Sequence, residues 1–340
     1  MTPLTIVMYH YVRPLGRSAF PAIKGLDLAL FDQQLDYLAR HYNPVSMEAV
    51  IDALDGRGEL PPQAVLLTFD DGYLDHYTYV FPRLAARGLT GAFFPPSKVV
   101  LERAMLDVNK IHFILASGAA PDDLVAAVER ACVERAAEFG LPGLDSFRKG
   151  NYHANRYDPV EVSYVKRMLQ QALPEALRAQ VTAELFARHV SADETAFAEG
   201  LYVSVEQLRL MVSAGMHVGS HGASHYWLSR LTPAEQEKDI AASLRLLAAV
   251  GTAPAYRSMC YPYGEFTEDT VAILARLDFK AAVTTRTALA EPGPATRFVL
   301  PRLDTNDLPK SAGADPCPWT LAAAHAVITD SSSGTLNAPS

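Results

Sequence analysis

Short apolar runs that alternate with segments of helical periodicity constrain the fold of this 340-residue chain more than any other feature. The runs are rich in β-branched and aromatic residues, and they occur at 4–9, 65–69, 90–94, 216–219, 257–261, 280–284 and 298–303. Strands that alternate with helices along a chain usually pair in parallel. We therefore expect an α/β fold with a mainly parallel sheet.

Capping signals place some of the intervening helices. Thr232-Pro233-Ala234-Glu235 combines an N-cap, an N1 proline and the acidic residue of a capping box, so a helix is predicted over about 233–249, before Gly251. Further helices are expected at 31–42, at 75–87 and from 205 to just before Gly215.

Two stretches depart from the alternation. Residues from about 101 to 200 are mostly Ala, Leu, Glu and Arg at helical spacing, which predicts a helical insertion within a domain spanning 1–310. Residues 311–340 are rich in Ser, Gly, Ala and Pro and predict a disordered tail.

Composition narrows the class of protein. The 30 basic residues are scattered among 38 acidic ones, giving a net charge of −8, so no nucleic-acid partner is expected. The three cysteines match no disulfide or metal spacing, which suits a reducing compartment. No signal peptide or membrane span is evident, and a soluble cytoplasmic protein is expected. The sequence indicates no oligomeric state.

Two adjacent aspartates, Asp70 and Asp71, follow the apolar run 65–69 and precede Gly72. Neighbouring carboxylates repel each other, and burying either one without a partner costs several kcal/mol. Either a cation neutralises the pair, or the residues form a solvated Asp-Asp-Gly turn.

Two histidines, His221 and His225, follow the run 216–219. On a helical turn they would face the same way, with β-carbons about 6 Å apart, which suits one metal ion. Together the two strand ends supply a two-His-one-carboxylate metal site and leave one carboxylate as a base toward water. A third strand end carries Tyr261-Pro262-Tyr263-Gly264, a rigid turn able to present a backbone N–H to an oxyanion.

In this order the three elements resemble the motifs of the polysaccharide deacetylase family, also called carbohydrate esterase family 4. The resemblance implies a distorted (β/α) barrel with the site at the C-terminal ends of its strands. It also implies that Asp71, His221 and His225 bind a divalent metal, usually zinc, that Asp70 is the general base, and that the backbone N–H of Tyr263 helps to hold the oxyanion.

The chain departs from the family pattern at two positions. The arginine that usually orients the base is replaced by Cys260, and Arg257 would point to the opposite face of the strand. The late motif Leu300–Thr305 lacks the usual histidine acid. His10, after the first strand, is the best substitute acid, although it could equally cap that strand.

Further residues are expected around the substrate. Tyr261, Pro262, Arg302 and Asp304 are predicted to contact it, and His153 in the insertion suits either sugar contact or a solvated loop.

The resemblance implies removal of an N-acetyl group from an amino sugar, through a metal-activated water with Asp70 as base. The expected setting is cytoplasmic glycan assembly, such as lipopolysaccharide or another surface polysaccharide. One alternative is a degenerate family member that binds glycan or metal without turnover, because the arginine and the usual acid are missing. Another keeps the chemistry but changes the acyl group or uses a non-sugar amide.

Overall fold

A computed structural model of the chain describes residues 2–155 and 158–324. Two compact units emerge. One comprises Met1–Pro14, Gly25–Ala104 and Glu199–Ser340, and the other comprises Leu15–Lys24 and Met105–Ala198. The second unit falls within the stretch predicted as a helical insertion, with the addition of Leu15–Lys24.

The first unit is built on parallel strands. Its main sheet has the order β10-β1-β5-β6-β7, and β4 pairs with β5 on a separate branch. All of these pairs are parallel. The strands are β1 (Leu4–Tyr9), β4 (Asn43–Pro44), β5 (Ala64–Asp70), β6 (Ala92–Phe94), β7 (His217–Val218) and β10 (Leu303–Asp304).

Two more strands and two single bridges connect β7 to β10, the strands at the two edges of this sheet. β8 (Ser258–Cys260) pairs in parallel with β9 (Ala281–Val283). Parallel bridges link Ser220 to Met259 and Val283 to Leu300, so that β8 connects to β7 and β9 connects to the segment before β10. The strands thus close into a distorted parallel (β/α) barrel, as the family resemblance implies. A short parallel pair, β2 (Val12–Arg13) and β3 (Leu26–Asp27), follows β1 in the sequence.

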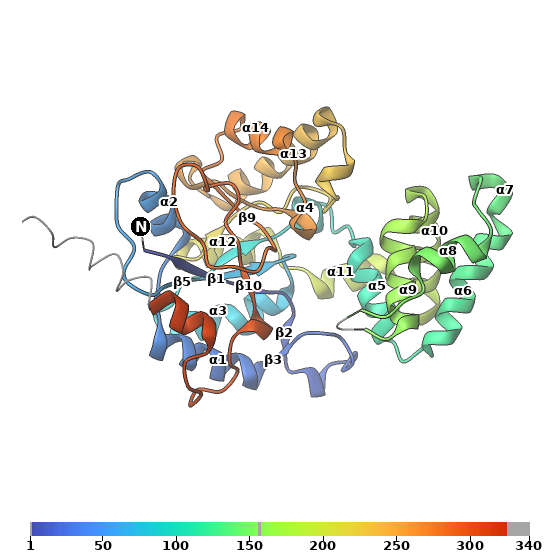
Figure 1. The fold of residues 1–340 in the computed structure, drawn as a ribbon, viewed down its shortest axis with the longest axis horizontal. Helices are drawn as coiled ribbons and strands as arrows, with labels where there is room; N and C mark the ends of the chain where they lie inside the picture. The colour runs from blue at the N-terminus through green and yellow to red at the C-terminus, as the bar shows by residue number, and fades with distance from the viewer. Residues whose placement is uncertain (1, 156–157, 325–340) are drawn as a thin grey trace, which may run out of the picture. The chain divides into compact units, whose positions relative to one another are not determined.

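Helices surround these strands, with α1 and α3 below them and α13 and α14 above them in Figure 1. The helices of this unit are α1 (Leu28–His41), α2 (Met47–Leu54), α3 (Phe81–Ala86), α4 (Ser97–Leu101), α12 (Val205–Ser213), α13 (Pro233–Val250) and α14 (Glu268–Arg276). The capping box of Thr232 and Glu235 is present and Gly251 is left-handed, which confirms the predicted start and end of α13.

The barrel interior is filled by side chains. Alternate residues of the strands, such as Leu4 and Ile6 on β1 and Leu66 on β5, share one buried cluster with Val50 and Ile51 of α2. Successive side chains of a strand point to opposite faces, so Thr68 and Asp70 project to the same side as Leu66. Asp70, at the C-terminal end of β5, therefore points to the same side of the strand as the buried interior cluster.

The second unit is helical. It contains α5 (Asp107–Ala116), α6 (Pro121–Glu134), α7 (Ala136–Phe139), α8 (Leu144–Asn151), α9 (Val160–Arg167) and α10 (Glu175–His189), and α11 (Glu194–Leu201) leads back into the first unit. In the part of the chain that the structure describes, no helix is both long enough and apolar enough to cross a membrane.

The predicted disordered tail needs a correction for its first part. Residues 318–324 are helical, and Thr320 is buried. Its hydroxyl lies 2.7 Å from the Tyr37 hydroxyl and accepts a hydrogen bond from the Tyr42 hydroxyl at 2.9 Å. This segment is ordered because it satisfies two buried tyrosine hydroxyls. Residues 325–340 lie outside the described part.

Candidate active site

The aspartate pair occupies the C-terminal end of β5. Asp70 is the last residue of the strand, and Asp71 adopts a left-handed backbone with φ 72°. At the next position, a β-carbon on Gly72 would lie 2.6 Å from Cβ of Pro95. The glycine therefore lets the chain turn sharply at this point. Asp70 and Asp71 are both buried, with at most 3% of either residue exposed.

The histidine pair lies on a loop, which corrects the predicted helical turn. Residues 221–225 follow β7 without helical structure, and His225 has φ 57°. The buried carboxylate of Asp239 on α13 accepts hydrogen bonds from the backbone N–H groups of Ala223 at 2.9 Å and Ser224 at 3.0 Å. The loop is thus held from outside the motif, and the two rings still meet at 4.7 Å between centroids.

Three side chains predicted to bind metal converge on one point. Oδ1 of Asp71 lies 3.5 Å from Nε2 of His221 and 3.4 Å from Nε2 of His225. This Oδ1 is buried and has no hydrogen-bond partner within residues 2–155 and 158–324, whereas Oδ2 accepts a hydrogen bond from the Tyr73 hydroxyl at 2.5 Å. A buried carboxylate oxygen without a donor, beside two imidazole nitrogens, is a set of atoms that a bound cation would satisfy.

The donor set fits a divalent cation. Ligand atoms about 2.1 Å from a tetrahedral zinc lie roughly 3.4 Å apart, close to the two observed separations. His221 directs Nδ1 at the carbonyl of Cys260 at 2.7 Å, so that its Nδ1–H donates there and Nε2 is the ring nitrogen left on the side of Asp71. Burial, followed by the neighbouring His221, lowers the pKa of His225 to about 3 and keeps that imidazole neutral.

Asp70 is paired with an arginine. Arg302 donates from Nη1 to Oδ1 at 2.9 Å and from Nη2 to Oδ2 at 2.8 Å, and it is itself 1% exposed. Burial alone would raise the pKa of Asp70, but the charge of Arg302 and its hydrogen bonds lower it below the usual value. The carboxylate is therefore kept ionised.

Arg302 also corrects two expectations. It was predicted to contact substrate, but its guanidinium is enclosed and contacts Asp70, the hydroxyl of Thr68 at 3.1 Å, the carbonyl of Thr284 at 2.8 Å and Sγ of Cys260 at 3.2 Å. The replacement at Cys260 does not leave the aspartate without an arginine. The small thiol lies beside the guanidinium of Arg302, which directly precedes β10.

The remaining predicted residues separate into two groups. His10 is at the site, with Nε2 3.9 Å from Oδ2 of Asp70 and a side chain that is 41% exposed. Its backbone carbonyl accepts from Nε2 of buried His76 at 2.8 Å, which fixes the chain at this strand end. Tyr263 packs its ring against His225, with centroids 4.6 Å apart.

The other group makes contacts within the protein and comprises Tyr261, Pro262 and Asp304. Tyr261 is fully buried and its hydroxyl donates to the carbonyl of Phe298 at 2.9 Å, while Pro262 is buried beside it. Asp304 caps a short helical turn by accepting from the N–H of Asn306 at 2.8 Å. Their predicted substrate contacts are not supported by these bonds. His153 is exposed in the helical unit.

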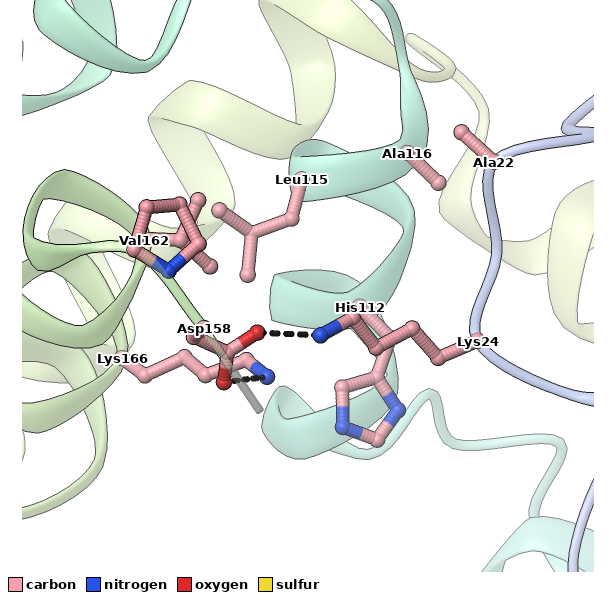
Figure 2. A pocket seen from close by; sticks show the side chains of 9 residues that line it. Ala22, Lys24, His112, Leu115, Ala116, Asp158, Val162 and Lys166 are labelled. Atoms are coloured by element: carbon pink, nitrogen blue, oxygen red, sulfur yellow. Dashed lines mark hydrogen bonds and ion pairs between the residues drawn. The ribbon is translucent and has the colours of Figure 1, made fainter. Parts of the chain in front are cut away.

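The helical unit contains a cavity of about 170 Å³ that is separate from these residues. Figure 2 shows Leu115 and Val162 on its apolar wall and Asp158 held between Lys24 and Lys166. Through its two ion pairs, Asp158 links Lys24 of the segment Leu15–Lys24 to Lys166 of α9 within this unit. None of the predicted metal or base residues lines the cavity.

The fold and site together define a parallel (β/α)-barrel protein with an Asp-His-His candidate metal centre next to an arginine-held aspartate. The model of the polysaccharide deacetylase family matches residues 165–282, which include both histidines and the Tyr261–Gly264 turn. Over this stretch the chain is similar to that family.

Relatives of known structure share the fold. The deacetylase PplD of Streptococcus pyogenes, in complex with acetate, superimposes with a TM-score of 0.54 at 17% identity, covering 92% of this chain and 96% of that one. IcaB from Ammonifex degensii gives 0.52 at 22% identity, covering 95% and 97%.

A curated relative is similar over a short stretch. The poly-beta-1,6-N-acetyl-D-glucosamine N-deacetylase of Escherichia coli K12 is 53% identical over 45 residues, which is 13% of this chain and 7% of that protein. The match thus spans a small part of the relative's length.

Proposed function

We propose that the protein is a metal-dependent hydrolase that removes N-acetyl groups from an amino-sugar glycan. The observation that carries this proposal is the position of Asp71 Oδ1, which is buried, has no hydrogen bond from any residue that the structure describes, and lies 3.5 and 3.4 Å from two imidazole nitrogens. Asp70, ionised through Arg302, is the adjacent residue.

The residues divide the chemistry among them. Asp71, His221 and His225 would hold the cation, which supplies Lewis-acid polarisation of the amide carbonyl and eases ionisation of water. Asp70 accepts the proton of the attacking water, and the backbone N–H of Tyr263 faces the developing oxyanion. His10 returns a proton to the leaving amine, since an amide nitrogen departs poorly as an anion.

The non-catalytic alternative loses its main support. It depended on the absence of a base-orienting arginine and of an acid at the usual positions. Arg302 is within hydrogen-bond distance of both oxygens of Asp70, and an imidazole lies 3.9 Å from the same carboxylate. These two contacts therefore favour a catalytic protein over one that only binds glycan or metal.

The substrate is proposed by analogy with the E. coli relative, which is named for poly-beta-1,6-N-acetyl-D-glucosamine. That polymer is the first candidate, and nucleotide-linked or lipid-linked N-acetyl sugars of a cytoplasmic assembly route are the second. The compartment and the preferred ion, for which zinc is our choice, are part of the proposal.

The test combines metal analysis with acetate release. Purified protein is assayed for bound divalent metal, then for acetate released from the polymer and from the activated sugars, beside Asp70→Asn and Asp71→Asn. We expect about one equivalent of metal, release from one substrate group, and loss of release in both variants. Wild-type protein that binds no divalent ion and releases no acetate would show the proposal to be wrong.

A further inference from the structure

A row of stacked side chains leads from the surface to one metal-ligand candidate. The rings of Trp227 and Tyr263 are parallel, with centroids 4.0 Å apart and an interplanar angle of 6°. The ring of Tyr263 then meets that of His225 edge to face, at 4.6 Å and 68°. On the outer side, the exposed Arg230 lies over Trp227 at 5.3 Å. We call Arg230, Trp227, Tyr263 and His225 the aromatic row.

The row compensates for a hydrogen bond that His225 lacks. His221 is oriented by its Nδ1–H, which donates to the Cys260 carbonyl at 2.7 Å. Nδ1 of His225 is buried and has no hydrogen-bond partner among the described residues. Histidines that bind metal are almost always held through the second ring nitrogen. The orientation of His225 therefore depends on packing, and the edge-to-face contact with Tyr263 supplies it.

Both inner members of the row have strained backbones. His225 has φ 57° and Tyr263 has φ 58°, values in the left-handed region that cost a non-glycine residue on the order of 1 kcal/mol or more. Such residues keep this conformation only when surrounding contacts determine it. The two belong to different loops, after β7 and after β8, and Trp227 of the first loop stacks on Tyr263 of the second.

We propose that Trp227 is a positioning residue for the metal centre. By stacking on Tyr263 it fixes the turn that carries the predicted oxyanion N–H, and through the Tyr263 ring it holds Nε2 of His225 toward Asp71. The inference rests on the proposed function and extends it to a residue with no role in the proposed chemistry. Its side chain has no part in the chemistry and acts through the two residues that it orders.

The test compares two substitutions at one position in the full-length chain. Trp227→Phe keeps an aromatic face for Tyr263, whereas Trp227→Ala removes it. Trp319→Phe is the matched control, because Trp319 is the other of the two tryptophans. Each protein is stripped of metal, checked for folding by urea denaturation, and titrated with Zn²⁺ by calorimetry and with Co²⁺ by its visible absorption. Acetate release then gives kcat and KM.

We expect Trp227→Ala to bind Zn²⁺ between about 10-fold and 100-fold more weakly, the usual effect of losing an outer support of a ligand. Its Co²⁺ bands should change in position or intensity, and kcat should fall with KM nearly unchanged. Trp227→Phe and Trp319→Phe should stay close to wild type in each measurement.

Two results would overturn the proposal while leaving the proposed function standing. One is a folded Trp227→Ala protein with wild-type metal affinity, Co²⁺ spectrum and kcat. The other is a raised KM alone, which would make Trp227 a substrate contact. If the wild-type chain binds neither ion, the proposed function and this inference both fail, so the two kinds of failure are distinguishable.

Discussion

The guanidinium of Arg302 and the carboxylate of Asp70 meet at two points, with Nη1–Oδ1 at 2.9 Å and Nη2–Oδ2 at 2.8 Å. Both side chains are buried, and Arg302 is fixed from behind because its Nε donates to the carbonyl of Thr284 at 2.8 Å. A forked pair of this kind sets the direction of the carboxylate as well as its charge. The pair therefore fixes the orientation of Asp70, the base of the proposed reaction.

Replacing Arg302 by lysine should separate charge from geometry. A lysine ammonium restores the positive charge but cannot form the two parallel hydrogen bonds. We expect Arg302→Lys to reduce kcat about 100-fold, as small displacements of a catalytic group can do. Arg302→Ala should in addition lower the free energy of unfolding by about 3–5 kcal/mol, since it leaves a buried carboxylate unpaired. Acetate release and urea denaturation measure the two effects.

Arg297→Lys is the matched control for this substitution. Arg297 donates to Asp55 at 2.9 Å in a partly exposed pair, away from the site residues. This substitution should change kcat less than about twofold, because the bond to Asp55 involves none of the site residues. A lysine at 302 with wild-type kcat would contradict the orienting role of the fork.

Removal of metal should abolish acetate release, and Asp71 should govern its return. After treatment with a chelator, activity should be lost and then restored by Zn²⁺ or Co²⁺. Asp71→Asn keeps the shape of the side chain but removes the charge, so its affinity for Zn²⁺ should fall by more than about 100-fold. Asp278→Asn, at an exposed residue with a similar φ of 63°, serves as control. Sustained turnover by metal-free protein would be the contrary result.

The effect of replacing His10 on kcat should depend on the leaving group of the substrate. Its Nε2 lies 3.9 Å from Oδ2 of Asp70, and as a general acid it should raise the rate of amide cleavage by about 100-fold to 10,000-fold. In His10→Ala we expect kcat for the N-acetyl sugar to fall by that factor. Release from 4-nitrophenyl acetate should fall much less, because the phenolate leaves without a proton. Metal content should remain unchanged. Equal losses on both substrates would argue that His10 acts on a different step.

The motif residues could be predicted from sequence because each follows a recognisable strand end. The parallel register then brings these ends together, as with Tyr9 of β1 opposite Phe69 of β5. Arg302 could not be assigned to Asp70 in this way, since the two are 232 residues apart and the contact depends on the closing of the ring. A useful signal was the arginine itself, because a charged residue ending an apolar run needs a buried partner.

The geometry of the histidine loop was also beyond local sequence reasoning. An i and i+4 spacing favours a helical turn, but Asp239 lies on another helix and accepts the N–H groups of Ala223 and Ser224. At the same place a β-carbon on Gly222 would come 2.6 Å from Oδ2 of Asp239. The hydrogen bonds to this carboxylate outweigh the preference of residues 221–225 for a helical turn. The sequence of residues 221–225 alone does not indicate that a carboxylate from residue 239 will bind there.

A hydrogen-bonded chain at the opposite ends of the strands should make stability depend on pH. Nδ1 of His217, at the start of β7, lies 2.6 Å from Oε1 of Glu48, and its Nε2 lies 2.7 Å from Oγ of Ser258, at the start of β8. Burial alone would raise the pKa of Glu48, but its hydrogen bond with His217 lowers it below the reference value of 4.5. The unfolded chain then holds more protons at this residue than the folded one in the interval between the two pKa values.

The sign follows from that difference. The contribution of Glu48 is fully present above pH 4.5 and is lost as the pH falls through its lower folded pKa. Glu48→Gln should therefore reduce the free energy of unfolding at pH 7 by about 1 kcal/mol, a value that allows for its partial exposure. The deficit should shrink steadily below about pH 4.5, as seen by urea denaturation at several pH values. Glu59→Gln, at an exposed glutamate, should show no such dependence. A deficit for Glu48→Gln that stays constant down to pH 3 would mean that the bond to His217 does not depend on the charge of the carboxylate.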